Sequence, residues 1–167
     1  TNDSIDFDPG PGEAWHYTQG PFTNYDAFVA KYNSSGDYLW SYTYGSTGSD
    51  IYTKIAIYDT NLIVVGRYDD SLDLNFDPLQ DSWHYPEGVG QDGFYVAKYN
   101  LDADYIWSFT LGDRLLENPS YRDFTIDDLG NILICGTFDD QFDVDPTSSV
   151  QSLTSQGSSD AFLISFD

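Results

Sequence analysis

The sequence is dominated by an internal repeat. Residues 28–45, FVAKYNSSGDYLWSYTYG, return as residues 95–112, YVAKYNLDADYIWSFTLG. Residues 61–70, NLIVVGRYDD, return as residues 131–140, NILICGTFDD. A repeat of this kind is a supersecondary unit that buries its apolar surface against the next copy. We therefore expect a modular fold made of similar units that pack side by side.

Four short apolar runs within the complete copy predict antiparallel strands. Each run is rich in β-branched and aromatic residues and is bounded by Gly, Asn or Asp. The expected strands are Ile51–Tyr58, Leu62–Leu74, Phe94–Tyr99 and Tyr105–Leu111. Four antiparallel strands per repeat, with aromatic residues at fixed offsets, are typical of a propeller blade, and no helical period is evident. The expected fold class is all-β, with tandem four-stranded antiparallel propeller-like blades that are incomplete at both ends.

The repeat also predicts three units along the chain. Unit 1, residues 1–46, holds the end of a second strand with a third and a fourth strand. Unit 2, residues 47–112, is a complete four-stranded blade, and unit 3, residues 113–167, holds a first, second and third strand. A closed propeller needs at least about four blades. We therefore expect that a longer repeat protein or neighbouring chains supply the missing strands.

If neighbouring chains supply the missing strands, we expect the chain to be a homo-oligomer that assembles through its open blade edges. An open edge presents unpaired backbone N–H and C=O groups on which another chain can add a strand. Addition of this head-to-tail kind produces a filament when its rotation does not close.

The charge of the chain excludes some partners. The net charge is −22, and nearly all the acidic residues are Asp, with Glu only at Glu13, Glu87 and Glu117. A field this negative repels phosphate backbones and anionic lipids, so we expect no nucleic-acid partner. No apolar stretch is long enough to span a membrane, so we expect no membrane insertion. The single cysteine, Cys135, lies in an apolar run and is expected to be buried.

An acidic turn occurs three times, once in each copy of the repeat, and is the strongest candidate site. It reads Asp6-Phe7-Asp8-Pro9, Asn75-Phe76-Asp77-Pro78 and Asp143-Val144-Asp145-Pro146. Alternate residues of an extended segment point to one side, so these carboxylates can converge on a cation. Their oxygens suit Ca²⁺, which takes 6–8 oxygen ligands. The alternative is that the Asp residues form Asx-turns and bind no ion.

The predicted calcium ligands fall into two groups. The turn ligands are Asp6, Asp8, Asp73, Asn75, Asp77, Asp143 and Asp145. The acids that precede each third strand, Asp26, Asp92 and Asp160, recur at nearly the same offset and can supply a further ligand.

Two tripeptides, Trp15-His16-Tyr17 and Trp83-His84-Tyr85, also recur. Trp15 and Trp83 are expected in loops, where they can form a platform for carbohydrate. The third copy lacks the tripeptide at residues 150–153, which argues against a shared catalytic histidine. We expect the two histidines to belong to an aromatic flap that packs over the blade.

The motifs together resemble a known family of bacterial β-propeller repeats of the seven-bladed type. Those repeats carry a DFDPGPG turn, a strand like DxFVAKLD, a strand like GxxxWAKSFGG and a strand like GNVYVTGSF. The corresponding segments here are residues 6–12, 26–31, 38–40 and 61–66. The chain departs from the pattern because only its first acidic turn keeps Pro-Gly-Pro-Gly. The resemblance covers essentially the whole chain and implies a secreted or cell-surface repeat protein, such as part of an adhesive or surface-layer chain.

These observations predict a non-catalytic extracellular module. Its expected role is structural or adhesive, with stabilisation by calcium and head-to-tail assembly into a filament or larger surface structure. The alternative is a lectin-like module that binds surface glycans through Trp15 and Trp83. We do not expect an enzyme, because no nucleophile and base recur together beyond the chemistry of turns.

Overall fold

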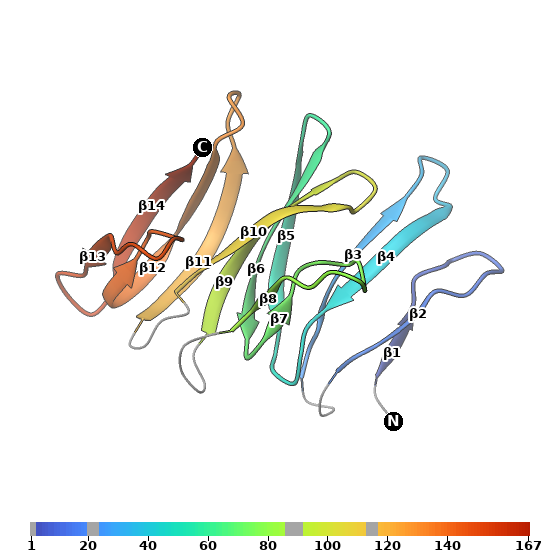
Figure 1. Cartoon of the computed structure of the whole chain (residues 1–167), viewed down its shortest axis with the longest axis horizontal. Coiled ribbons are helices and arrows are strands. Elements are labelled where there is room, and N and C mark those ends of the chain that lie inside the picture. The colour runs from blue at the N-terminus through green and yellow to red at the C-terminus, as the bar shows by residue number, and fades with distance from the viewer. Residues whose placement is uncertain (1–2, 20–23, 86–91, 113–116) are drawn as a thin grey trace.

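The computed structural model describes residues 3–19, 24–85, 92–112 and 117–167. These residues form antiparallel strands and no helix (Figure 1). The described residues therefore contain no helix that could cross a membrane. The all-β class predicted from the sequence is confirmed.

The strands follow the three units in chain order. Unit 1 contains β1 (Ser4–Asp6), β2 (Trp15–Tyr17), β3 (Ala27–Tyr32) and β4 (Tyr38–Tyr44). Unit 2 contains β5 (Ile51–Tyr58), β6 (Asn61–Asp69), β7 (Leu72–Asp73), β8 (Trp83–His84), β9 (Asp92–Asn100) and β10 (Tyr105–Leu111). Unit 3 contains β11 (Glu117–Ile126), β12 (Ile132–Asp143), β13 (Ser152–Thr154) and β14 (Asp160–Phe166). Figure 1 shows the units as successive layers, from the blue N-terminal strands to the red C-terminal ones.

Unit 2 forms a four-stranded antiparallel sheet in the order β10-β9-β6-β5. The first and fourth strands have the predicted bounds. The prediction of one second strand over Leu62–Leu74 is wrong, because that segment divides into β6 and β7. Asp70 lies between them with a φ of 75°. Residues other than glycine seldom adopt this left-handed conformation, and it turns the chain out of the sheet.

The long acidic loops expected after each second strand contain small hairpins. β1 pairs with β2, β7 pairs with β8, and the end of β12 pairs with β13. We call these three pairs the acidic hairpins, since each acidic turn forms the tip of one. Strands of two or three residues carry too short an alternation to be predicted from sequence.

The core lies between the units, and unit 2 is buried on both faces. Leu62 and Val64 of β6 pack in a cluster with Val29 and Tyr44 of unit 1. Ile63 and Val65, which point to the other face, pack with residues of unit 3 such as Ile134 and Phe162. Alternate residues of a strand point to opposite faces, so a strand between two neighbours must be apolar throughout. This explains the continuous apolar run of β6.

Cross-unit polar contacts add to this packing. Lys54 Nζ forms an ion pair of 2.8 Å with Asp123 Oδ1, and Tyr58 OH donates to the carbonyl oxygen of Asp128. These partners are 69 and 70 residues apart, about one repeat. The repeat length is therefore the distance along the chain from one layer to the next.

The burial of Cys135 differs from what the sequence predicted, whereas the propeller arrangement stays a prediction. Cys135 is half-buried, because the alternation of β12 turns its neighbours Ile134 and Gly136 inward instead. The described sheets do not close into a propeller ring. The structure therefore supports an all-β protein with two four-stranded sheets and leaves the propeller as a proposal.

Candidate functional site

The first acid of each acidic hairpin closes that hairpin from within. Asp6 Oδ1 accepts hydrogen bonds from the amides of Asp8 at 3.0 Å and Ala14 at 2.8 Å. Asp73 Oδ1 accepts from Asn75 at 3.0 Å and Ser82 at 2.9 Å. In the third copy, Asp143 Oδ1 accepts from Asp145 at 3.0 Å and Gln151 at 2.8 Å. One carboxylate oxygen thus joins both sides of each hairpin, which is the Asx-turn role.

The register of the hairpins corrects the sequence alignment of the second turn. Asn75 was expected to match Asp6, but Asp73 holds the closing position instead. The residue that follows each closing acid confirms this register, because a tyrosine binds its carbonyl oxygen in both units. Tyr32 OH donates to the carbonyl of Phe7, and Tyr99 OH donates to that of Leu74. The second turn therefore places two additional residues, Asn75 and Phe76, before its Asp-Pro. Between the closing acid and the amide across the hairpin it is one residue longer than the other two turns, with a separation of 9 residues against 8.

The second acid of each turn caps its tip. Asp8 Oδ1 accepts from the amide of Gly10 at 2.7 Å, Asp77 Oδ1 from that of Leu79 at 3.0 Å, and Asp145 Oδ1 from that of Thr147 at 2.8 Å. The amide of Leu79 and the side chain of Gln80 lower the pKa of Asp77. Asn75 forms a similar turn, because its Oδ1 accepts from the amide of Asp77.

The acids that precede the third strands also bind backbone amides. Asp26 Oδ2 accepts from the amide of Gln19, and Asp160 Oδ2 accepts from the amide of Gln156, both at 2.7 Å. Asp92 begins β9, but its side chain lies outside the described part of the structure. These acids therefore hold the loops that lead into β3 and β14.

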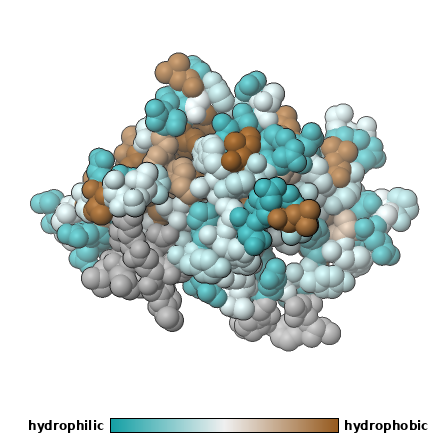
Figure 2. Space-filling view, in the orientation of Figure 1, coloured by the Kyte–Doolittle hydropathy of each residue, from teal (hydrophilic) through white to brown (hydrophobic). Residues whose placement is uncertain are grey.

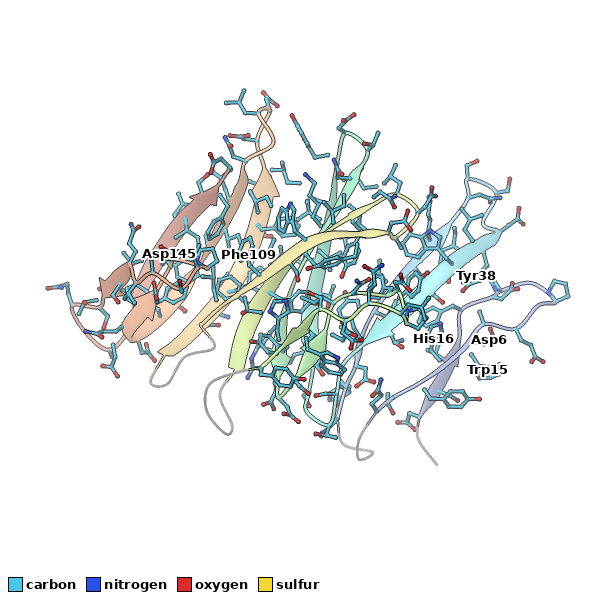
Figure 3. All side chains as sticks on the ribbon, in the orientation of Figure 1. Asp6, Trp15, His16, Tyr38, Phe109 and Asp145 are labelled. Atoms are coloured by element: carbon cyan, nitrogen blue, oxygen red, sulfur yellow. The ribbon has the colours of Figure 1, made fainter. Side chains whose placement is uncertain are left out.

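The described side chains do not bring the predicted calcium ligands together into a metal-binding group. Among residues 3–19, 24–85, 92–112 and 117–167, no group of three or more His, Cys, Asp or Glu side chains is arranged to hold a metal ion. Asp6 and Asp145 lie at opposite ends of the molecule (Figure 3). The geometry favours the turn-forming alternative at each hairpin, and calcium binding stays a prediction.

A buried carboxylate that the sequence did not single out lies between units 1 and 2. Asp50 is 1% exposed and accepts hydrogen bonds from the amides of Ser46 and Asp69. Burial raises its pKa to about 7, and the nearby charge of Asp26 adds to this rise. Burial also raises the pKa of Asp26. The only sequence signal is an acid at the entrance of an apolar strand, which is too common to be informative.

The two histidines form equivalent hydroxyl networks under the hairpins. His16 Nε2 lies 2.9 Å from Ser41 Oγ, which lies 2.9 Å from Tyr38 OH (Figure 3). In unit 2, His84 Nε2 lies 2.8 Å from Ser108 Oγ, and Tyr105 OH lies 2.8 Å from the same oxygen.

These networks fasten each hairpin to the strand beneath it. Burial lowers the pKa of His16, which favours the neutral form of its imidazole. Ser41 is buried, so its hydroxyl belongs to the packing between hairpin and strand. The recurring Tyr-x-x-Ser of β4 and β10 was the available signal, and its spacing gave no reason to connect it with the histidines.

The tryptophans of the repeated tripeptides lie in short strands and not in loops, which corrects the prediction. Trp15 is 49% exposed in β2, and Trp83 is 45% exposed in β8. Because side chains alternate along a strand, Trp83 and Tyr85 point out while His84 points in. The rings of Trp83 and Tyr85 are stacked, with centroids 6.0 Å apart and planes at 23°.

Apolar residues lie as separate patches among polar ones on the face shown in Figure 2. The described residues therefore offer three kinds of candidate site: the acidic hairpins, the exposed aromatic pairs and the spaces between units. Comparisons of the chain with protein-family models, with curated proteins and with solved structures found no match.

Proposed function

We propose that the chain is a non-catalytic, extracellular structural or adhesive module that joins a second copy of itself through paired strand edges. In this proposal each unit is a propeller-like blade, and an edge strand of one copy extends the sheet of the next. The resemblance of the repeat motifs to surface-protein repeats supports the extracellular placement. The observation that carries the assembly is the pairing of β3.

In the described part of the structure, the strand β3 is paired on one side only. Its equivalent in the complete unit, β9, lies between β6 and β10. Among the described strands, β3 pairs with β4 alone. A groove of about 710 Å³ runs along β3 toward β5, and Ile5, Phe28 and Ile55 line it. An exposed strand edge beside apolar side chains is a template for another strand.

The last strand offers a matching edge. Within the described strands, β14 pairs with β12 alone and leaves its other edge without a neighbour. Leu163 of β14 is 71% exposed, and Phe28 of β3 is 53% exposed. Pairing of β14 in one copy with β3 in the next gives a continuous five-stranded sheet, β11-β12-β14-β3-β4, one strand more than the sheet of unit 2. The contact is heterologous, so it repeats from copy to copy.

The charge sets the conditions for this assembly. A net charge of −22 makes two copies repel each other, so association requires salt to screen the charge. Calcium is a further proposed stabiliser, since the hairpin tips concentrate carboxylates on the surface of each unit.

Sedimentation velocity across a concentration series tests the assembly. We expect monomers at low salt and larger species at about 0.5 M NaCl, where the Debye length falls well below its value of about 10 Å at 0.1 M. The substitution Leu163→Lys places a charge beside the β14 edge and should shift the association to at least ten-fold higher protein concentration.

The matched control is Leu129→Lys. Leu129 is 83% exposed in the turn between β11 and β12, away from either free edge. It makes the same change of charge and should leave association unchanged. A monomer at all concentrations and at both salt levels would contradict the proposed assembly.

A second function, carbohydrate binding, is favoured by the stacked pair of Trp83 and Tyr85. Trp15 and Tyr17 hold the equivalent sequence positions in unit 1 and are 49% and 60% exposed. Exposed aromatic faces on a rigid hairpin suit stacking against sugar rings. A glycan array probed with the wild type and with the double variant Trp15→Ala and Trp83→Ala tests this function. Signals that persist in the double variant, or no signals at all, would count against it.

A further inference from the structure

A glycine lies directly opposite an aromatic residue where the second and third strands of a unit pair. In unit 2, Gly66 of β6 is the register partner of Tyr95 of β9. In unit 3, Gly136 of β12 is the register partner of Phe162 of β14. The same combination therefore occurs in both units in which the structure pairs these two strands.

The glycine leaves room for the aromatic ring. A Cβ atom at Gly66 would lie 2.6 Å from Tyr95 Cζ. At Gly136 a Cβ atom would meet Phe162 Cζ at 2.6 Å, as well as the backbone of Ser120. Carbon atoms that are not bonded prefer a separation of about 3.5–4.0 Å, so a side chain at either glycine would displace the ring. A glycine within a strand often marks such a close approach.

The third strand of unit 1 carries the aromatic residue and has no glycine opposite it among the described strands. Phe28 of β3 is equivalent to Tyr95, since each directly precedes the sequence Val-Ala-Lys-Tyr. Their register partners on the fourth strand, Thr43 and Thr110, are also equivalent. Tyr95 is fully buried, whereas Phe28 is 53% exposed. Phe28 thus holds one half of an arrangement that the other two units complete.

The groove beside β3 follows the edge of this strand. The consecutive residues 27–30 all line it, although alternate side chains of a strand point to opposite faces. The groove therefore runs along the backbone edge of β3 and not along one face. Phe7 holds Phe28 at this edge, with their ring centroids 4.9 Å apart.

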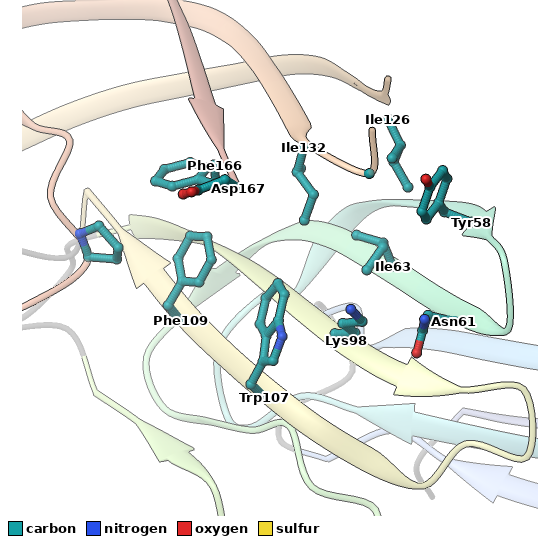
Figure 4. Close-up of a pocket in the computed structure, with 12 residues that line it drawn as sticks. Tyr58, Asn61, Ile63, Lys98, Trp107, Phe109, Ile126, Ile132, Phe166 and Asp167 are labelled. Atoms are coloured by element: carbon teal, nitrogen blue, oxygen red, sulfur yellow. The ribbon is translucent and has the colours of Figure 1, made fainter. Parts of the chain in front are cut away.

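The edge of β3 has the sequence that β6 meets within unit 2. Residues 29–32 of β3 and the equivalent stretch of β9 both read Val-Ala-Lys-Tyr, and in unit 2 this stretch lies opposite residues 62–65. Figure 4 shows one pair of that register, Ile63 of β6 and Lys98 of β9, beside a cavity between units 2 and 3 that Phe109 also lines. A strand with the sequence of β6 therefore meets the same residues on β3, in the same order.

We propose that the edge of β3 binds an extended apolar strand of another polypeptide that places a glycine opposite Phe28 and lacks acidic residues, as residues 61–68 do. The backbone of that strand pairs with β3, and its glycine lets the ring pack against it. Asp6, Asp26 and Asp50 line the groove and disfavour an acidic partner.

Self-association, as proposed for this chain, uses the same open edge, on which this inference therefore rests. The sequence of β14 contains an acid and no glycine. A strand with a glycine should therefore occupy the edge more tightly than β14 does, and should block assembly.

Fluorescence anisotropy with a labelled peptide of residues 61–68, NLIVVGRY, tests the site on the monomer at low salt. We expect saturable binding by the wild-type protein. A peptide with Gly66→Ala should bind at least about ten-fold more weakly, because its Cβ atom collides with the ring of Phe28. Alanine is no worse than glycine in strands, so the loss would not reflect strand propensity. The matched control is a peptide with Asn61→Ala, which changes the far end of the strand and should bind like the parent.

A variant of the protein identifies the residue that selects the glycine. Phe28→Ala removes the ring from a half-exposed position and should bind the parent peptide and the Gly66→Ala peptide equally. Equal binding of the two peptides by the wild type would overturn the proposal, as would the absence of saturable binding. A preference for glycine that persists in Phe28→Ala would show that this ring does not select the partner.

Sedimentation velocity at about 0.5 M NaCl separates this inference from the proposed assembly. Excess parent peptide should keep the chain monomeric, because it occupies the edge that β14 would use. Glycine-dependent binding to a chain that never associates would support this inference and contradict the assembly. Association that persists with the peptide bound would contradict the part that β3 plays in assembly and the blocking role of the peptide.

Discussion

The rings of Tyr42 and Phe76 are parallel within 5°, with centroids 4.2 Å apart, although the two residues belong to different units. Phe76 comes from the tip region of an acidic hairpin, and Tyr42 comes from β4 of the preceding unit. The hairpin that appeared in the sequence as a candidate ion site thus has a packing role: it inserts a ring between two layers. Offset or stacked aromatic pairs contribute about 0.5–1.5 kcal/mol beyond their area burial.

Truncation of this ring should destabilise the chain. We expect Phe76→Ala to lower the free energy of unfolding by about 2–3 kcal/mol, because the stacked contacts with Tyr42 and Tyr99 are lost and a void is left. Urea denaturation measures the change. Leu79→Ala in the same turn is the control: Leu79 is 90% exposed, and its loss should change stability by no more than about 0.5 kcal/mol. Equal effects of the two variants would contradict the bridging role of Phe76.

The closing carboxylate of the second hairpin is expected to act as an acceptor and not as a charge. Asp73→Asn keeps an oxygen for the amides of Asn75 and Ser82, so its cost should stay below about 0.5 kcal/mol. Asp73→Ala leaves both amides without this partner and should cost about 1–2 kcal/mol. Thermal and chemical denaturation at pH 7 compare the two. A loss with Asn as large as that with Ala would instead indicate that the negative charge matters.

Asp50 should make the chain less stable as pH rises. Its pKa is about 7 in the folded state against an ordinary value of 3.8, so the folded state holds more protons between these values. Stability is then highest below about pH 4 with respect to this group and declines up to about pH 7, by about 2–4 kcal/mol.

Asp50→Asn should remove this contribution to the pH slope, whatever its effect on absolute stability. The measurement is the free energy of unfolding at several pH values from 4 to 8, with Asp102→Asn, an exposed acid, as the control. A slope that Asp50→Asn leaves unchanged would show that Asp50 does not titrate with a raised pKa.

Calcium should raise the melting temperature if the hairpin carboxylates share an ion. The expected response is saturable at millimolar Ca²⁺ and larger than that to Mg²⁺, because flexible oxygen sites suit the larger ion. Differential scanning calorimetry at constant ionic strength separates this from general screening of the −22 charge. Equal shifts with both ions would leave only the turn-forming role. An Asp8→Asn variant tests the first hairpin, since it keeps the acceptor for Gly10 but removes charge.

Much of the sheet structure was predictable because it is local. The bounds of β5 and β10 follow from apolar runs that end at turn residues, and the four-stranded order follows from their succession. The division of the second predicted strand into β6 and β7 could not be predicted, because an Asp-Asp pair gives no sign that Asp70 adopts a left-handed conformation. The small hairpins were missed for a related reason: they depend on side-chain acceptors and on packing against the sheet below.

The candidate site was predicted by residue type but not by role. Repetition singled out the acids of the turns, yet it aligned Asn75 with Asp6, and only the hairpin register assigned that position to Asp73. The role of these acids as calcium ligands stays a prediction. Asp50 and the cavity beside Phe109 had no sequence signal. Both arise where two units meet, and a repeat pattern describes one unit at a time.

The sequence by itself determined that this protein is all-β, that its chain contains repeated copies of one motif set, and that short acids recur in its turns. These properties depend on backbone preferences and on contacts within a few residues, which the order of amino acids specifies directly. The tertiary structure alone decided which acid closes each hairpin, which carboxylate is buried and which interface holds a ring. Those outcomes depend on how the surfaces of two units fit together, which no residue pattern within one unit specifies.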